Sequence, residues 1–346
     1  MGSQLSALGS QAAVLLALLA QQQPGLQEQI TVERVIVDAR VTNSVGDPIT
    51  GLKASDFIVK IDGKRATVES ADWNWDSATS REIAEDLNGG QALSPVPSVS
   101  HGRLLIFLYQ TDFARNNARV RGQMKLLQLN GDWLDWIEPE DRVAVLSFDS
   151  HLKFRLDFTN NKHDIAYAME QALYISDPPW PQRVPLPALG SRLKPEELAQ
   201  AGSPERALIE ISNALMNIAG PKSLILFGWG LGRFSREGVH MAPNYGIARQ
   251  ALEMARVSVF SIDFTEADSH SLAAGLEKVA GDTGGFYAST HNFPHLAAKR
   301  LQRTLSGHYE LEVRKPPTSF RGTHAIEVEV PRRDAYVMAR STYIDR

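Results

Sequence analysis

Cysteine is absent from the 346-residue sequence, which excludes disulfides, zinc–thiolate sites and cysteine nucleophiles. A charge excess is absent as well: 36 Lys and Arg face 40 Asp and Glu, and the formal net charge of −4 predicts no basic surface for nucleic acid. The apolar stretch Ala12–Ala20 is shorter than the roughly 20 residues that a membrane helix needs. With 43% hydrophobic residues, the chain is predicted to be globular and to have no membrane span.

The N-terminal segment has some features of a signal peptide and lacks others. Ala12–Ala20 has the length of a signal-peptide core, and the polar Gln21–Pro24 follows it. No Lys or Arg precedes Arg34, so the positively charged start of a signal peptide is missing. We expect residues 1–29 to be a signal peptide or a disordered leader, the alternative being a retained extension. The protein is then expected to be secreted or to reside in the periplasm or cell envelope.

Alternating apolar residues predict β-strands in both terminal regions. Residues 30–75 contain strand patterns, among them Phe57–Ile61 followed by the hairpin dipeptide Asp62-Gly63, and the pattern returns in residues 308–346. Each region holds about three strands, which is marginal for independent stability. We therefore predict that the two regions pair into one Ig-like β-sandwich, the alternative being two separate β appendages. Residues 76–100 are polar and rich in Gly, Pro and Ser, which predicts a linker.

Strand and helix patterns alternate through residues 101–307. Leu104–Leu108 is a continuous apolar run typical of a strand buried on both faces, and Leu152–Phe158 fits an antiparallel edge strand. Ser203-Pro204 is typical of a helix start. This order predicts an α/β fold with an open, mainly parallel, Rossmann-like sheet and helices on both faces. The Pro-rich segment Asp177–Pro195 is predicted to be a surface insertion.

Four motifs in a fixed order resemble those of one known group of domains. They are Asp47–Leu52, Ala280–Tyr287, His308–Leu311 and Ala339–Tyr343. Together with the order of strands and helices, they are similar to the von Willebrand factor A-like (vWA-like) domain proteins, in particular to the VWFA-related type first described from acidobacteria. The resemblance covers the chain from about residue 30 to its end and implies a vWA-like α/β domain at residues 101–307.

The resemblance implies a binding site at the carboxyl ends of the parallel strands. Such domains hold a divalent ion there with an Asp-x-Ser-x-Ser loop and with a Thr and an Asp from two other loops. In this chain Tyr109 and Trp229 stand where the two Asp residues are expected, while Thr111 and Thr159 keep hydroxyls. Without the carboxylates, an ion such as Mg²⁺ has little charge compensation. The candidate binding positions are Tyr109, Thr111, Asp112, Phe113, Thr159, Gly228, Trp229 and Gly230, together with Trp180 of the insertion.

Motifs of other chemistries are missing or incomplete. Gly228–Gly232 follows a strand, but Arg233 stands where a dinucleotide fingerprint needs its third glycine. The sequence contains neither a His-Glu-x-x-His nor a Gly-x-Ser-x-Gly motif. The acids of Glu138–Asp141 precede a strand and are expected to be solvated.

We predict a non-enzymatic, metal-independent vWA-like module that binds a protein or cell-surface ligand and uses no cofactor. Two alternatives stay open. The first is an adhesion module that depends on Mg²⁺ or another divalent ion, held by Thr111, Asp112 and Thr159. The second is a hydrolase whose active site cannot be recognised from spacing, because hydrolytic triads are assembled by geometry rather than by sequence order.

Overall fold

The computed structural model describes residues 33–87, 102–111, 121–122, 124, 130–185, 187–266, 270–290, 294–316 and 321–345. By its contacts the chain divides into Met1–Glu33 and Arg34–Arg346, and the elements below belong to the second unit. The predicted signal peptide and the candidate residues Asp112 and Phe113 lie outside the described residues. Within the described ranges, no helix is long and apolar enough to cross a membrane.

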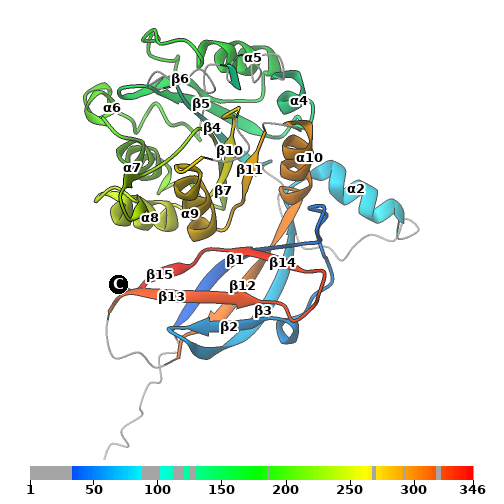
Figure 1. Ribbon diagram of the computed structural model, residues 1–346. Helices are drawn as coiled ribbons and strands as arrows, with labels where there is room; N and C mark the ends of the chain where they lie inside the picture. Colours follow the sequence, from blue (N-terminus) through cyan, green and yellow to red (C-terminus); the bar gives the residue numbers. More distant parts are fainter. Residues whose placement is uncertain are drawn as a thin grey trace, which may run out of the picture. The chain divides into compact units, whose positions relative to one another are not determined.

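Strands from the two terminal regions interleave in a seven-stranded sheet (Figure 1). Its strands are β1 (Arg34–Thr42), β2 (Ile58–Ile61), β3 (Lys64–Trp75), β12 (Gly307–Arg314), β13 (Gly322–Glu329), β14 (Tyr336–Ala339) and β15 (Thr342–Asp345). They are arranged in the order β14-β1-β12-β3-β2-β13-β15. Because β12 lies between β1 and β3, neither terminal region could form this sheet alone.

The core of this β module lies on one face of its strands. The two-residue period places Val35, Val37 and Ala39 of β1 inside, together with Tyr309 and Leu311 of β12. The hydrogen bonds connect all seven strands into one sheet. The Ig-like sandwich therefore stays a prediction.

The first part of the predicted linker is wrong, because Ala78–Leu87 forms helix α2 (Figure 1). The hydroxyl oxygen of Ser77 accepts a hydrogen bond from the Ser80 N–H (3.0 Å). The carboxylate of Glu138 accepts one from the Ala78 N–H (2.9 Å). These acceptors satisfy N–H groups that a helix start otherwise leaves unpaired. Local composition does not reveal this helix because Glu138 comes from a distant loop.

A six-stranded sheet forms the second module, in the order β11-β10-β7-β4-β5-β6. Its strands are β4 (Leu104–Gln110), β5 (Arg142–Phe148), β6 (Leu152–Thr159), β7 (Lys222–Gly228), β10 (Val257–Asp263) and β11 (Tyr287–Ser289). Neighbouring strands are parallel except β5 and β6, which pair antiparallel at the sheet edge. The predicted mainly parallel sheet with an antiparallel edge strand is confirmed.

Helices cover both faces of this sheet (Figure 1). They are α4 (Asn130–Leu134), α5 (Lys162–Gln171), α6 (Pro195–Gln200), α7 (Pro204–Leu215), α8 (Tyr245–Met254), α9 (Ala273–Thr283) and α10 (Pro294–Thr304). Residues of α7, α8 and α9 share one core cluster with Ile106 and Leu108. Residues of α4, α5 and α10 share the other with Leu105, Phe107 and Tyr109. Successive side chains of β4 thus point to opposite faces, as a strand requires.

A small hairpin and one 3₁₀ turn complete the described elements. The hairpin consists of β8 (Arg233–Ser235) and β9 (Gly238–His240), and follows the loop after β7. The 3₁₀ turn η2 (Ala54–Asp56) precedes β2. The Asp177–Pro195 segment is without helix or strand over its described residues until α6 begins at Pro195. The predicted surface location is wrong for its second part, because Leu189 and Leu193 are buried in the core.

Candidate functional site

The strand order of the six-stranded sheet reverses between β4 and β7. The chain runs from β4 through β5 to β6, and then continues on the other side of β4 with β7, β10 and β11. In open α/β sheets, ligands bind in the crevice outside the carboxyl ends of the strands at such a switch point. The residues that leave β4 and β7 at this point are Gln110-Thr111 and Gly228-Trp229-Gly230.

The side chain of Gln110 bridges the two strand ends. Gln110 is buried, and its side-chain oxygen accepts hydrogen bonds from the backbone N–H groups of Trp229 (3.1 Å) and Gly230 (3.4 Å). A Cβ atom on Gly228 would lie 3.0 Å from this oxygen, so a glycine gives the amide room. The two loops are therefore held together by a neutral amide of the protein itself, which we call the Gln110 bridge.

Tyr109 is a core residue, which corrects its inclusion among the binding positions. Its side chain is fully buried and stacks on Phe227, with ring centroids 4.7 Å apart. Burial raises the pKa of the Tyr109 phenol well above its usual value. Because side chains of a strand alternate between faces, Tyr109 points into the core with Phe107, while Gln110 reaches the crevice.

Thr111 is buried as well, and its polar groups are engaged. Its N–H (2.6 Å) and its hydroxyl (3.3 Å) both donate to the Phe148 carbonyl at the end of β5. Over the described residues, no group of three or more His, Cys, Asp or Glu side chains could hold a metal ion.

Thr159 lies near the amino ends of the parallel strands, whereas Thr111 lies at their carboxyl ends. This corrects the assignment of both residues to one site. Strand β6 is antiparallel to β5, and Thr159 pairs with Val143 near the start of β5. The Thr159 hydroxyl oxygen accepts from the Asn161 N–H (3.1 Å) just before α5. An antiparallel strand ends where its neighbour begins, so its last residue cannot reach the carboxyl ends of the parallel strands.

A cavity of about 620 Å³, which we call the crevice cavity, adjoins the Gln110 bridge and is lined by the loop after β7 and by the start of α7. Ser203 lines it and caps α7, since its hydroxyl oxygen accepts from the Arg206 N–H (3.3 Å). Gly230 allows a close approach here, because a Cβ atom on it would lie 2.5 Å from that of Leu272. The Ser203-Pro204 motif predicts the start of the helix that lines this cavity. Nothing in the sequence indicates that this helix start lies beside Trp229.

Glu205 contributes a buried acid to the crevice cavity. It is 3% exposed, and among the described residues its carboxylate has neither a hydrogen bond nor an ion pair. Its place in the first turn of α7 stabilises a negative charge through the helix dipole. Arg206 and Arg233 also line the cavity, and both are exposed.

Trp180 lies in a different groove, of about 580 Å³, which is also lined by Thr159 and Tyr167. Trp180 is 43% exposed and packs edge-on against Phe154, with ring centroids 5.3 Å apart. Tyr167 is more exposed still. The predicted binding positions therefore fall on two surfaces: Trp229 and Gly230 line the crevice cavity, and Thr159 and Trp180 line the insertion groove.

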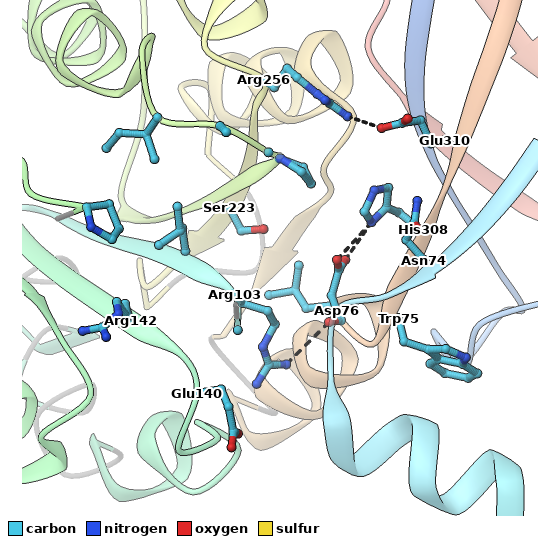
Figure 2. A pocket seen from close by; sticks show the side chains of 18 of the residues that line it. Asn74, Trp75, Asp76, Arg103, Glu140, Arg142, Ser223, Arg256, His308 and Glu310 are labelled. Carbon is cyan, nitrogen blue, oxygen red and sulfur yellow. Dashed lines mark hydrogen bonds and ion pairs between the residues drawn. The ribbon is translucent and has the colours of Figure 1, made fainter. Parts of the chain in front are cut away.

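A further cavity, of about 810 Å³, lies at the amino ends of the parallel strands (Figure 2). Its walls come from both modules, with Ser223 of β7 on one side and Asp76 and His308 of the β module on the other. The His308 ring nitrogen Nδ1 lies 2.9 Å from the Asp76 carboxylate. Sequence reasoning missed this cavity because no single segment supplies it.

A serine hydroxyl, a histidine ring and a carboxylate contact one another in series at the turn between β5 and β6. The Ser150 hydroxyl lies 3.1 Å from Nδ1 of His151, and Nε2 of His151 lies 3.3 Å from the Asp177 carboxylate. The same hydroxyl lies 3.1 Å from the Asp149 carboxylate. No sequence spacing indicates this series of contacts, because Asp177 belongs to the insertion.

No family model and no curated protein matches the sequence. Among solved structures, a von Willebrand factor type A protein from Catenulispora acidiphila is similar over 92% of this chain and 74% of its own, with 7% identity and a TM-score of 0.42. The conserved hypothetical protein BatB from Bacteroides thetaiotaomicron is similar over 59% of this chain and 98% of its own, with 13% identity and a TM-score of 0.36.

Proximal thread matrix protein 1 from the mussel byssus is similar over 62% of this chain, with 16% identity and a TM-score of 0.39. The match spans 48% of that mussel protein, about half of its length. One structure of the mussel protein has a zinc-occupied MIDAS motif. Likenesses of this degree carry no statement about ligands or activity of the present chain.

The architecture itself defines the class of the second module. The sheet order, the single antiparallel edge strand and the helices on both faces make it a vWA-like α/β domain. The chain thus combines an α/β module of vWA-like architecture with a β module built from its two terminal regions.

Proposed function

We propose that the protein is a non-catalytic interaction module that binds a protein or cell-surface ligand without a metal ion, and that it acts as a secreted or cell-envelope protein. The Gln110 bridge carries the proposal, because a protein amide already holds the loops after β4 and β7 in place. A crevice ordered in this way needs no ion to position its loops.

The groups in the crevice cavity favour a ligand with a basic side chain. Trp229 lines the cavity, although its side chain also packs against the core cluster of Tyr109 and Phe227, and aromatic residues contribute strongly to binding interfaces and attract cations. Glu205 supplies an acid that lacks a partner among the described residues. A lysine or arginine of a partner could therefore pair with Glu205 while its stem covers the indole.

Binding to immobilised surface extract of the source organism, measured by surface plasmon resonance, tests the proposal. We expect the same affinity in EDTA and in Mg²⁺. Trp229→Ala should weaken binding by at least about tenfold, since a central aromatic contact is worth about 2 kcal/mol or more. Glu205→Gln should weaken it too, and more at low than at high ionic strength.

Tyr336→Ala serves as the matched control, because Tyr336 is an exposed aromatic residue of the β module (57% exposed). Its affinity should equal that of the unaltered protein. Loss of binding in EDTA would contradict the metal-independent mode. Equal binding by the Trp229→Ala variant would show that the crevice cavity is not the contact surface.

The chain Ser150–His151–Asp177 supports a second candidate function, that of a hydrolase. A serine hydroxyl next to an imidazole that contacts a carboxylate has the composition of a hydrolytic triad. Labelling with a fluorophosphonate probe and turnover of p-nitrophenyl esters test this candidate. The interaction proposal expects neither, whereas labelling and turnover that Ser150→Ala abolishes would establish the hydrolase.

A further inference from the structure

The insertion groove, of about 580 Å³, is lined by helix α5, by strand β6 and by the first part of the Pro-rich insertion. Its volume falls within the range of roughly 300–1,000 Å³ that ligand sites occupy. Helix α5 lines it with Asp164, Tyr167, Ala168 and Gln171. Residues spaced by three, four and seven positions lie on one face of a helix, so α5 presents a continuous wall about 10 Å long.

Two aromatic side chains of the insertion groove are open to solvent. Tyr167 is 61% exposed and Trp180 is 43% exposed. The edge-on contact with Phe154, at 5.3 Å between ring centroids, holds the Trp180 ring in place. Four of the eleven exposed large hydrophobic side chains of the described residues fall within residues 167–180. Such a concentration of exposed apolar surface is typical of an interaction site.

Polar contacts fix the insertion to β6 at two points. A terminal nitrogen of Arg155 donates to the carbonyl of Tyr174, just before the insertion (2.7 Å). Asp157 is 2% exposed and accepts from the N–H groups of Leu189 and Gly190, both at 2.8 Å. The groove therefore has its shape before a ligand arrives, which lowers the entropic cost of binding.

The charge that the insertion groove offers to a ligand is negative. Three acids and one arginine line it, and Asp157 and Arg155 are engaged in the contacts that hold the insertion. The carboxylate of Asp177 pairs with the buried Lys153 (3.0 Å). Asp164 is 51% exposed, and its ion-pair partner within the described part of the chain is the exposed ring of His163 at 3.7 Å. Asp164, three residues before Tyr167 on α5, is thus an acid that an incoming cation can reach.

We propose that the insertion groove binds an extended, proline-rich peptide of a partner protein that carries an arginine or a lysine. Such peptides dock in aromatic-lined grooves because their polyproline II helix is already formed and loses little entropy. One turn of this helix rises about 9 Å, which matches the wall of about 10 Å that α5 presents. The prolines pack on Tyr167 and Trp180, and the basic side chain pairs with Asp164. This groove and the crevice cavity are separate surfaces, so the proposal does not depend on the proposed function.

Fluorescence anisotropy of labelled peptides titrated with the full chain tests the proposal. The probes are Arg-Pro-Pro-Ala-Pro-Pro-Ala and Ala-Pro-Pro-Ala-Pro-Pro-Arg, which place the basic residue at either end. We expect at least one of them to bind with a Kd below about 1 mM. Tyr167→Ala should weaken this binding by at least about fivefold, because an aromatic contact is lost. Asp164→Asn should weaken it by a smaller factor that disappears at high ionic strength.

Phe234→Ala is the matched control, since Phe234 is an exposed aromatic residue (70% exposed) of the β8–β9 hairpin, outside the groove. Its affinity should equal that of the unaltered protein. Tyr167→Ala changes an exposed helix position and should leave thermal unfolding unaltered, so its result decides even if Trp180→Ala loosens the insertion.

Three results would each overturn the proposal: absence of binding by both peptides, equal affinity of the Tyr167→Ala variant, or equal binding of peptides with glutamate in place of arginine. Binding of the neutral sugar chitohexaose at least as tight as that of the peptides, and lost in the Tyr167→Ala variant, would also overturn it and identify a glycan groove.

Discussion

Different interactions hold the loops at the carboxyl ends and at the amino ends of the parallel strands in the six-stranded sheet. At the carboxyl ends, the neutral Gln110 bridge holds the loops, and Glu205 is the buried acid of the crevice cavity. At the amino ends, buried charges dominate: Arg103 pairs with Asp141, and Arg256 connects the vWA-like domain to Asp38 of the β module. The loops after β4 and β7 are thus joined by a neutral amide, while the Lys153–Asp149 pair lies at the end of β5; at the amino ends, buried ion pairs make the connections.

The largest loss of stability is expected from a substitution at the amino ends of the parallel strands. Asp141 is 1% exposed and accepts from the backbone and the side chain of Arg103 as well as from the Glu138 N–H. Asp141→Asn removes the closest ion-pair partner of the buried Arg103 and leaves only Glu138, at 4.0 Å, which costs about 3–5 kcal/mol. Urea unfolding measures this loss. Arg332→Ala, in an exposed ion pair, should leave the midpoint unchanged; equal effects of both variants would contradict the contrast between buried and exposed pairs.

The second largest effect is expected when the free energy of unfolding is measured at alkaline pH. Burial, assisted by the charge of Arg256 and opposed by that of Asp38, lowers the pKa of Lys222 to about 8. Its ammonium group donates to the carbonyls of Gly220 and Ala255. Between pH 8 and 10.5 the unfolded chain holds more protons at Lys222 than the folded chain does. Stability should therefore rise with pH in this window, by on the order of 3 kcal/mol.

Urea unfolding at pH 7.5, 9 and 10.5 checks this dependence on pH. Lys222→Met is the comparison variant, since it keeps the apolar stem and removes the titrating group. The rise should be smaller in this variant than in the unaltered protein. The same slope in both proteins would show that Lys222 does not cause it.

A smaller loss of stability is expected from a substitution at the carboxyl ends of the parallel strands. Gln110→Ala removes the acceptor of the Trp229 and Gly230 N–H groups and should destabilise the fold by about 1–3 kcal/mol. Faster hydrogen exchange of the Trp229 amide should accompany this loss. Gln110→Glu keeps an oxygen acceptor and should preserve slow exchange. Fast exchange in the Glu variant, or slow exchange in the Ala variant, would show that the bridge does not hold the loop.

Local periodicity accounts for the parts of the fold that the sequence predicts well. The apolar run Leu104–Leu108 and the edge strand Leu152–Phe158 both appear as strands, because the alternation of buried side chains is visible within a few residues. Helix α7 begins at Pro204 after the Ser203 cap, again for local reasons. The interleaving of β12 between β1 and β3 needs contacts across the whole chain, and its strand order could not be predicted.

The site was harder to predict because it depends on direction and on distant partners. A shift of one residue in a strand exchanges faces, which is why Tyr109 is in the core and Gln110 in the crevice. Because β6 is antiparallel to β5, Thr159 lies near the amino ends of the parallel strands and not at their carboxyl ends. Asp141, expected to be solvated, is buried because Arg103, 38 residues earlier, supplies the compensating charge. None of these three outcomes can be read from the residue type alone.

The most direct test of the central claim, a crevice ordered without metal, is a calorimetric titration of the full chain with Mg²⁺, Mn²⁺ and Ca²⁺. The account predicts no binding tighter than a Kd of about 1 mM for any of the three ions. Tighter binding that Thr111→Val abolishes would contradict it, because the ion would then depend on a residue at the end of β4 beside the Gln110 bridge.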